Sequence, residues 1–143
     1  MTMPKGVRLA CDVGTVRIGV ARSDFHGILA VPLDAVAAGD ESFKMIALLV
    51  DEYDAVEVIV GLPLKMDGTE GTSADMARDW VTTLVGHVAI PIRFVDERLT
   101  TVQAQRGLHA AGRTIKNSRS AIDSASAVVL LQSVLDAAGS KSE

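Results

Sequence analysis

The chain has 143 residues, of which 48 % are hydrophobic and 22 % charged, and its formal net charge is −4. These values are typical of a globular protein and exclude a disordered chain. No apolar run reaches the roughly 18 residues of a membrane span and no signal peptide is recognisable, so we expect no membrane partner. The single cysteine, Cys11, allows no internal disulfide, which predicts a cytoplasmic protein. We expect one domain over residues 1–138 and a disordered tail over residues 139–143.

The N-terminal part of the chain predicts three strands connected by tight turns. The first is an apolar run that ends at Asp12, and the turn after it contains Gly14. The second alternates apolar and polar residues for part of its length, as a half-buried strand does. The third contains Pro32, which favours an edge strand or a bulge. The predicted strands span residues 7–12, 16–23 and 28–36.

The rest of the chain alternates helical and extended patterns. Three strands that form hairpins, followed by alternating helices and strands, predict an α/β domain. Its five-stranded mixed sheet would combine a three-strand antiparallel meander with two parallel strands, flanked by helices. Two segments lack either pattern and are predicted to be a mobile loop (64–70) and a basic loop (112–119). The further strands are predicted at 55–60 and 90–96, and the helices at 42–53, 72–85, 100–111 and 120–138.

Three acids stand where a predicted strand ends or a predicted helix begins, namely Asp12, Glu97 and Asp123. Functional sites in such sheets gather at the carboxyl ends of the parallel strands. A carboxylate at the end of an apolar strand is costly to desolvate unless a cation meets it. Carboxylate oxygens suit a hard divalent cation, and a site of this kind suits phosphodiester hydrolysis. We therefore predict that these acids form a catalytic site for Mg²⁺, with Mn²⁺ as a substitute.

Each acid also has an ordinary structural explanation, which the sequence leaves open. Asp12 could accept hydrogen bonds from N–H groups of the turn that follows it. Only one of Asp96 and Glu97 can face the site directly, because strand neighbours point to opposite faces, and both would favour the N-terminus of the next helix. Asp123 fits a capping box with Ser120, although the spacing of the apolar residues after it places it along the buried face.

Positive charge gathers in one part of this acidic chain. Residues 93–119 contain six Lys and Arg against two acids, a local charge of +4. This predicts a face that attracts phosphate, with a solvated helix face and a polar loop as the alternative. Aromatic residues make up only 3 % of the chain, which argues against base stacking as the mode of binding. The expected phosphate contacts are Arg17, Arg98, Arg113, Lys116 and Arg119.

Four motifs in order resemble those of the YqgF/RuvX family, and together they span nearly the whole chain. The resemblance implies an RNase H-like fold and a Mg²⁺-dependent nuclease whose acids fall on Asp12, Glu97 and Asp123. Segment 116–121 has fewer Lys and Arg than is common in the family. The motifs are Asp12-Val13-Gly14-Thr15 within residues 8–21, Gly61-Leu62-Pro63 within 61–71, Asp96-Glu97-Arg98-Leu99 within 96–101, and Ile122-Asp123-Ser124-Ala125 within 122–132.

The resemblance implies a cytoplasmic enzyme that matures the 5′ end of the precursor of 16S ribosomal RNA (rRNA). The main alternative is a Holliday junction resolvase, by the family's likeness to RuvC-type enzymes. The expected partner is therefore structured RNA or branched DNA. A resolvase would act as a two-fold homodimer, whereas an RNA nuclease could act as a monomer. An alternative from another class is a non-catalytic nucleic-acid-binding assembly factor.

Overall fold

A computed structural model describes residues 4–99 and 124–141, and its five strands form one mixed sheet in the order β3-β2-β1-β4-β5. The first three strands form the predicted antiparallel meander, and β4 and β5 run parallel to β1. The predicted fold class is therefore confirmed. The strands are β1 (Arg8–Val13), β2 (Arg17–Ser23), β3 (Ala30–Ala37), β4 (Glu57–Leu62) and β5 (Ile92–Asp96).

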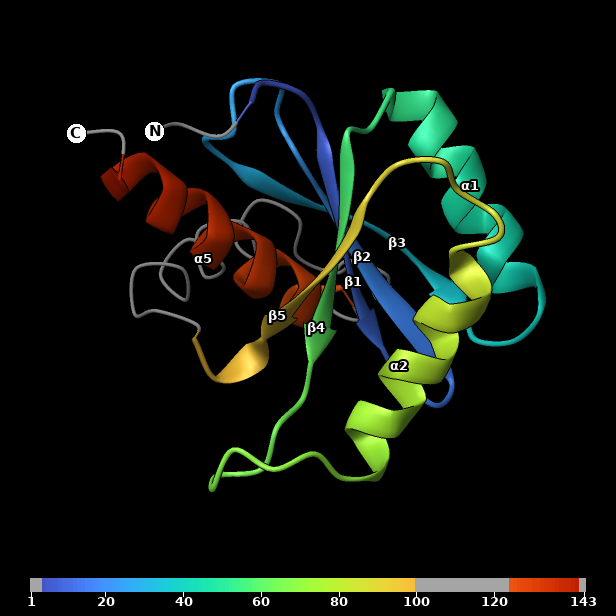
Figure 1. Ribbon diagram of the computed structural model, residues 1–143. Helices are drawn as coiled ribbons and strands as arrows, with labels where there is room; N and C mark the ends of the chain where they lie inside the picture. The colour runs from blue at the N-terminus through green and yellow to red at the C-terminus, as the bar shows by residue number, and fades with distance from the viewer. Residues whose placement is uncertain (1–3, 100–123, 142–143) are drawn as a thin grey trace.

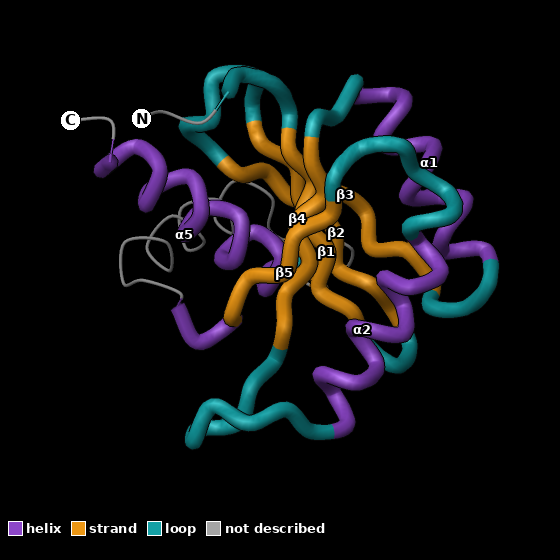
Figure 2. Tube along the Cα trace, in the orientation of Figure 1, coloured by secondary structure: helices purple, strands orange, loops and turns teal. Residues whose placement is uncertain are grey.

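Helices cover both faces of the sheet, so the molecule has three layers (Figures 1 and 2). On one face lie α1 (Glu41–Tyr53) and α2 (Thr72–Leu84), and on the other lies α5 (Ala125–Lys141). A single 3-10 turn, η1 (Glu97–Leu99), follows β5 directly. Among residues 4–99 and 124–141, no helix has the length and apolar character needed to cross a membrane. The predicted helix at 100–111 and the basic loop at 112–119 lie outside the described residues.

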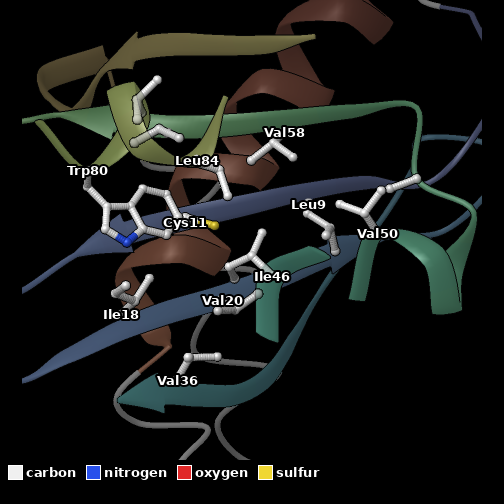
Figure 3. Close-up of a cluster of buried hydrophobic side chains, with 13 residues drawn as sticks. Leu9, Cys11, Ile18, Val20, Val36, Ile46, Val50, Val58, Trp80 and Leu84 are labelled. Carbon is white, nitrogen blue, oxygen red and sulfur yellow. The ribbon is translucent and has the colours of Figure 1, made fainter. Parts of the chain in front are cut away.

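The larger core lies between the sheet and the helices α1 and α2 (Figure 3). It contains Cys11, which is fully buried, as its place in an apolar strand predicts. Burial, and secondarily the charge of Asp12, raises the pKa of the Cys11 thiol to about 12, so the thiol stays protonated. The only tryptophan, Trp80, packs in the same core and donates a hydrogen bond to Ser42 Oγ at 3.0 Å. This bond joins α2 to α1.

The second core lies under α5 and is built largely from small residues. Ala10, Ala21 and Ala30 from three neighbouring strands meet Ala127 of the helix. Because alanine side chains are short, α5 lies close to the sheet. A side-chain amide at the middle of the helix also reaches the edge strand: Gln132 accepts from Ala30 N and donates to the Ile28 carbonyl, both at 2.9 Å.

The N-terminal end of α5 is fixed to the sheet by Ser124, whose side chain is fully buried. Its hydroxyl accepts a hydrogen bond from Val20 N at 3.0 Å and donates one to the Leu33 carbonyl at 2.7 Å. The pairing of β2 with β3 shifts register between Ile18 and Val20, next to this contact. The hydroxyl therefore bridges two strands at an irregularity of the sheet, and it places the start of α5 there.

Several boundaries differ from the prediction. β4 continues through Gly61 to Leu62, where the sequence predicted an end near residue 60, because its last residues pair with β5. α5 continues to Lys141, since the lone Gly139 without a following proline does not end the helix. The predicted loop at 64–70 is a short hairpin, closed by a bridge between Leu64 and Glu70, with Gly68 at a positive φ of 88°.

Candidate active site

Asp12 lies near the carboxyl end of β1, in the centre of the sheet, and is half-buried. Side chains alternate along a strand, so Asp12 shares the face of Ala10, which is the face that α5 covers. Its register partner on β2 is Gly19. On the other side, Gly61 of β4 follows Val60, the register partner of Cys11. Two glycines therefore flank Asp12 and leave space for other groups above the sheet.

Glu97 is the first residue of η1, immediately after the end of β5. In Figure 1, η1 lies at the end of β5 on the side of the sheet that α5 covers. The Glu97 side chain lies over Gly61 of β4, and its carboxyl group shares a hydrogen bond with that of Asp12. The structure thus brings together two of the three predicted acids from β1 and the end of β5.

Within the Asp12–Glu97 pair, Glu97 holds its proton more tightly than an ordinary glutamate. Burial is the largest cause that raises the pKa of Glu97, to about 8, followed by the hydrogen bond and the charge of Asp12. Glu97 therefore keeps its proton at neutral pH and can donate the hydrogen bond that joins it to Asp12. No ion pair joins either acid to a Lys or Arg within residues 4–99 and 124–141. Two half-buried carboxyl groups without such a partner are a donor set that fits a hard divalent cation.

The third predicted acid, Asp123, lies outside the described residues. Among the residues that are described, no group of three or more His, Cys, Asp or Glu side chains is placed to hold a metal ion. The described part of the site is therefore the Asp12–Glu97 pair, and the role of Asp123 stays a prediction.

Strand alternation left open which of Asp96 and Glu97 faces the site, and the local geometry resolves this in favour of Glu97, the predicted acid. Glu97 faces Asp12, whereas Asp96 accepts hydrogen bonds from the backbone N–H and the guanidinium of Arg98. This pairing lowers the pKa of Asp96 from its ordinary value, first through the Arg98 side chain. Arg98 Nη1 also lies 3.5 Å from the carbonyl oxygens of Lys65 and Met66, so Arg98 connects β5 to the 64–70 hairpin.

The other predicted phosphate contacts are placed only in part. Arg17 is exposed at the start of β2, next to the turn that follows Asp12. A Cβ at Gly14 would lie 2.6 Å from the Arg17 carbonyl oxygen, so this turn requires glycine. Arg113, Lys116 and Arg119 lie outside the described residues, and their contacts stay predictions.

Gly61 and Ser124 were named only as members of two family motifs, and the sequence predicted no role for either. Nothing in the sequence shows that an acid 36 positions after Gly61 lies over it. Ser124 directly follows a predicted site acid and was given no contact of its own. Its contacts to Val20 and Leu33 join residues about 90 to 100 positions apart, and no local pattern indicates them.

Comparison with protein families gives a match over most of the chain. The family model described as "RuvX: Holliday junction resolvase" matches residues 6–137. A "Putative pre-16S rRNA nuclease" from Mycobacterium ulcerans is 53 % identical over 135 residues, covering 92 % of this chain and 79 % of the relative. A protein of the same name from Leifsonia xyli is 47 % identical over 137 residues, covering 94 % and 88 %. The chain therefore belongs to the RuvX family.

Among solved structures, the chain is similar to Thermus thermophilus RuvC in complex with a Holliday junction substrate. The TM-score is 0.61 at 12 % sequence identity, and the match covers 94 % of this chain and 96 % of that one. A second structure of the same protein gives a TM-score of 0.59 at 14 % identity, covering 93 % and 96 %. This likeness shows a shared fold and confirms the predicted RNase H-like architecture.

Proposed function

We propose that this member of the RuvX family is a divalent-metal-dependent nuclease whose site is formed by Asp12, Glu97 and Asp123. The observation that carries the proposal is the contact between the Asp12 and Glu97 carboxyl groups at the carboxyl ends of β1 and β5. Mg²⁺ is the cation that we expect, with Mn²⁺ as a substitute, because both accept carboxylate oxygens. When bound, the ion supplies the Lewis acidity for attack on a phosphodiester bond.

The chain's own contribution is to hold its carboxyl groups in place before the metal arrives. Asp12 is held by strand pairing on both sides of β1, and Glu97 is held across β4. The proton that Glu97 keeps at neutral pH would be released when a cation binds. The pair therefore binds metal without a large rearrangement of the sheet.

A third ligand from Asp123 is supported by the anchoring of its neighbour. One peptide bond joins Asp123 to Ser124, so the two Cα atoms are separated by about 3.8 Å. Ser124 is hydrogen-bonded to Val20 N, and Val20 follows Gly19, the register partner of Asp12. The chain thus enters α5 beside the strand position that faces Asp12. This makes Asp123 the natural third acid.

We further propose that Arg17, Arg113, Lys116 and Arg119 position the nucleic acid through its phosphates. Such contacts orient a substrate without reading its sequence. Arg98 contributes to this surface less directly, because its guanidinium already pairs with Asp96 at 2.8 Å. A phosphate near Arg98 would have to share the guanidinium with that carboxylate.

The proposed substrate is the precursor of 16S rRNA, because the relatives from M. ulcerans and L. xyli are named as putative pre-16S rRNA nucleases. Cleavage at its 5′ end, in the cytoplasm, is what the family resemblance adds to this proposal. The family description favours a second candidate, cleavage of a four-way DNA junction. A junction enzyme must cut two strands symmetrically and would act as a homodimer, whereas a monomer is sufficient for an RNA end.

The proposal is tested by cleavage of both substrates with purified protein. We expect Mg²⁺-dependent cleavage of a 16S rRNA precursor by the wild type and loss of that cleavage to background in Asp12→Asn. Asp79→Asn is the matched control, because Asp79 is an exposed acid on α2 and should cut as well as the wild type. Cleavage that survives Asp12→Asn contradicts the metal site. Cleavage of the junction alone would favour resolution, and tight binding without cleavage would indicate an assembly factor.

A further inference from the structure

Gly61 stands out because it is a glycine inside a paired strand. Its register partner on β5 is Val95, and it lies one residue before the end of β4. A glycine within a strand costs backbone entropy and leaves no side chain to pack, so a strand gains nothing from it without a special contact. Its φ is not among the positive values of the described glycines, so its backbone conformation does not require glycine.

The special contact is with Glu97. A Cβ built on Gly61 would overlap Glu97 Oε1 and would lie 2.9 Å from both Glu97 Cγ and Cδ. Real Cβ atoms are essentially never this close to a neighbour. Glu97 could yield only by moving its carboxyl group, and that group is the one that meets Asp12. A side chain at position 61 would therefore disturb the Asp12–Glu97 pair.

The order of the strands explains why this crossing is needed. β4 lies between β1, which carries Asp12, and β5, which Glu97 follows. Adjacent strands are about 4.8 Å apart, so β1 and β5 are separated by roughly 10 Å. A glutamate that starts at the end of β5 meets Asp12 only if its side chain runs across the surface of β4. Any side chain on β4 at that level would stand in its way.

We propose that Gly61 is a positioning residue, which keeps the surface of β4 clear so that the Glu97 carboxyl group can reach Asp12. This inference rests on the proposed function, because the Glu97 side chain needs to cross β4 only if it forms a metal site with Asp12. Gly61 itself contributes no ligand and touches no substrate in this account. Its effect is steric and acts through one partner, so a double-mutant cycle can isolate it.

The test uses Gly61→Ala and Glu97→Ala, alone and together, in the full chain. The first measurement is the calorimetric titration of MgCl₂ alone into metal-free protein. We expect Gly61→Ala to weaken Mg²⁺ binding by about 10- to 100-fold, the range for residues that orient metal ligands. Adding Gly61→Ala to Glu97→Ala should cause no further loss, because the carboxyl group that it displaces is already absent.

The second measurement is the melting temperature of the same proteins without metal. Gly61→Ala should lower it in the wild type and clearly less in the Glu97→Ala background, where the overlap is gone. If Gly61→Ala alone fails to fold but the double variant folds, the steric claim is supported by that rescue. Gly86→Ala is the matched control, because its nearest atom would be the Thr83 carbonyl oxygen at an ordinary 3.5 Å.

Two results overturn the inference. One is wild-type Mg²⁺ affinity in Gly61→Ala, and the other is an equal loss of melting temperature in both backgrounds. A failure of the proposed function would give a different pattern of results. If Glu97→Ala leaves Mg²⁺ binding intact, the metal site is wrong, while the melting temperatures still decide whether Gly61 makes room for Glu97.

Discussion

Glu97 is the residue whose chemistry depends most on its surroundings. Burial first, and Asp12 next, raise its pKa from 4.5 to about 8. Between these values the folded protein keeps a proton that the unfolded chain releases. Folding is therefore linked to proton uptake, and the contribution of Glu97 to stability falls as pH rises through this interval. The protonated carboxyl group of Glu97 is compatible with the fold. Its charged form destabilises the fold unless a cation is bound beside it.

Replacing the carboxyl group by an amide should remove this pH dependence. We expect metal-free Glu97→Gln to melt a few degrees higher than the wild type at pH 8.5 and at about the same temperature at pH 5, because the amide keeps the hydrogen bond without the charge. Thermal melting at several pH values measures this, with Asp79→Asn as the control. Parallel profiles for wild type and Glu97→Gln would show that Glu97 titrates normally.

At the scale of elements, the placement of α5 matters because the proposed third acid, Asp123, directly precedes Ser124 at the start of this helix. The helix is held by an alanine-lined surface and by two polar anchors, Ser124 at its start and Gln132 at its middle. Ser124 is the more demanding anchor, because its hydroxyl satisfies both a backbone N–H and a carbonyl in the sheet. A buried backbone group without a partner loses the free energy of its hydration.

Ser124→Ala should therefore lower the free energy of unfolding by about 2 kcal/mol, the middle of the range for leaving buried polar groups unpaired. Cleavage should fall further than this loss explains, because Asp123 loses the anchor beside it. Urea unfolding and cleavage at a temperature where the variant is fully folded separate the two effects. Ser126→Ala is the control on the exposed face of α5. Wild-type cleavage by folded Ser124→Ala would show that α5 needs no such anchor.

The sequence predicted the parts of the molecule that depend on local pattern. Strand alternation and the tight turn at Gly14 are visible in neighbouring residues, and they predict the meander. Strand alternation alone could not choose between Asp96 and Glu97, because the choice depends on how the chain turns into η1 after β5; the family motif pointed to Glu97. The role of Gly61 depends on strand order and on register between β4 and β5, which are set by tertiary pairing.

At the scale of the whole molecule, charge is separated along the chain. A net charge of −4 coexists with a local charge of +4 over residues 93–119. An acidic protein with one basic segment can still attract nucleic acid, because attraction depends on the local potential. Such binding releases counterions and therefore weakens as salt is added.

Salt dependence tests this account of binding. We expect affinity for nucleic acid to fall linearly with salt on a log–log plot, because phosphate contacts dominate. Replacing Arg113, Lys116 and Arg119 together by alanine should reduce the slope by roughly 0.7–0.9 for each phosphate that the variant no longer neutralises. Fluorescence anisotropy with labelled RNA measures the slope, and Lys44→Ala on α1 is the control. An unchanged slope in the triple variant would place the binding surface elsewhere.

The central claim is that Asp12 and Glu97 together hold a divalent cation, whose binding displaces the proton that Glu97 keeps at neutral pH. Calorimetric titration of Mg²⁺ at pH 7, in buffers with different heats of ionisation, measures both the affinity and the protons released. We expect release of close to one proton by the wild type, no release by Glu97→Gln, and much weaker binding by Asp12→Asn. Binding of Mg²⁺ without proton release, or with equal affinity in Asp12→Asn, would contradict it.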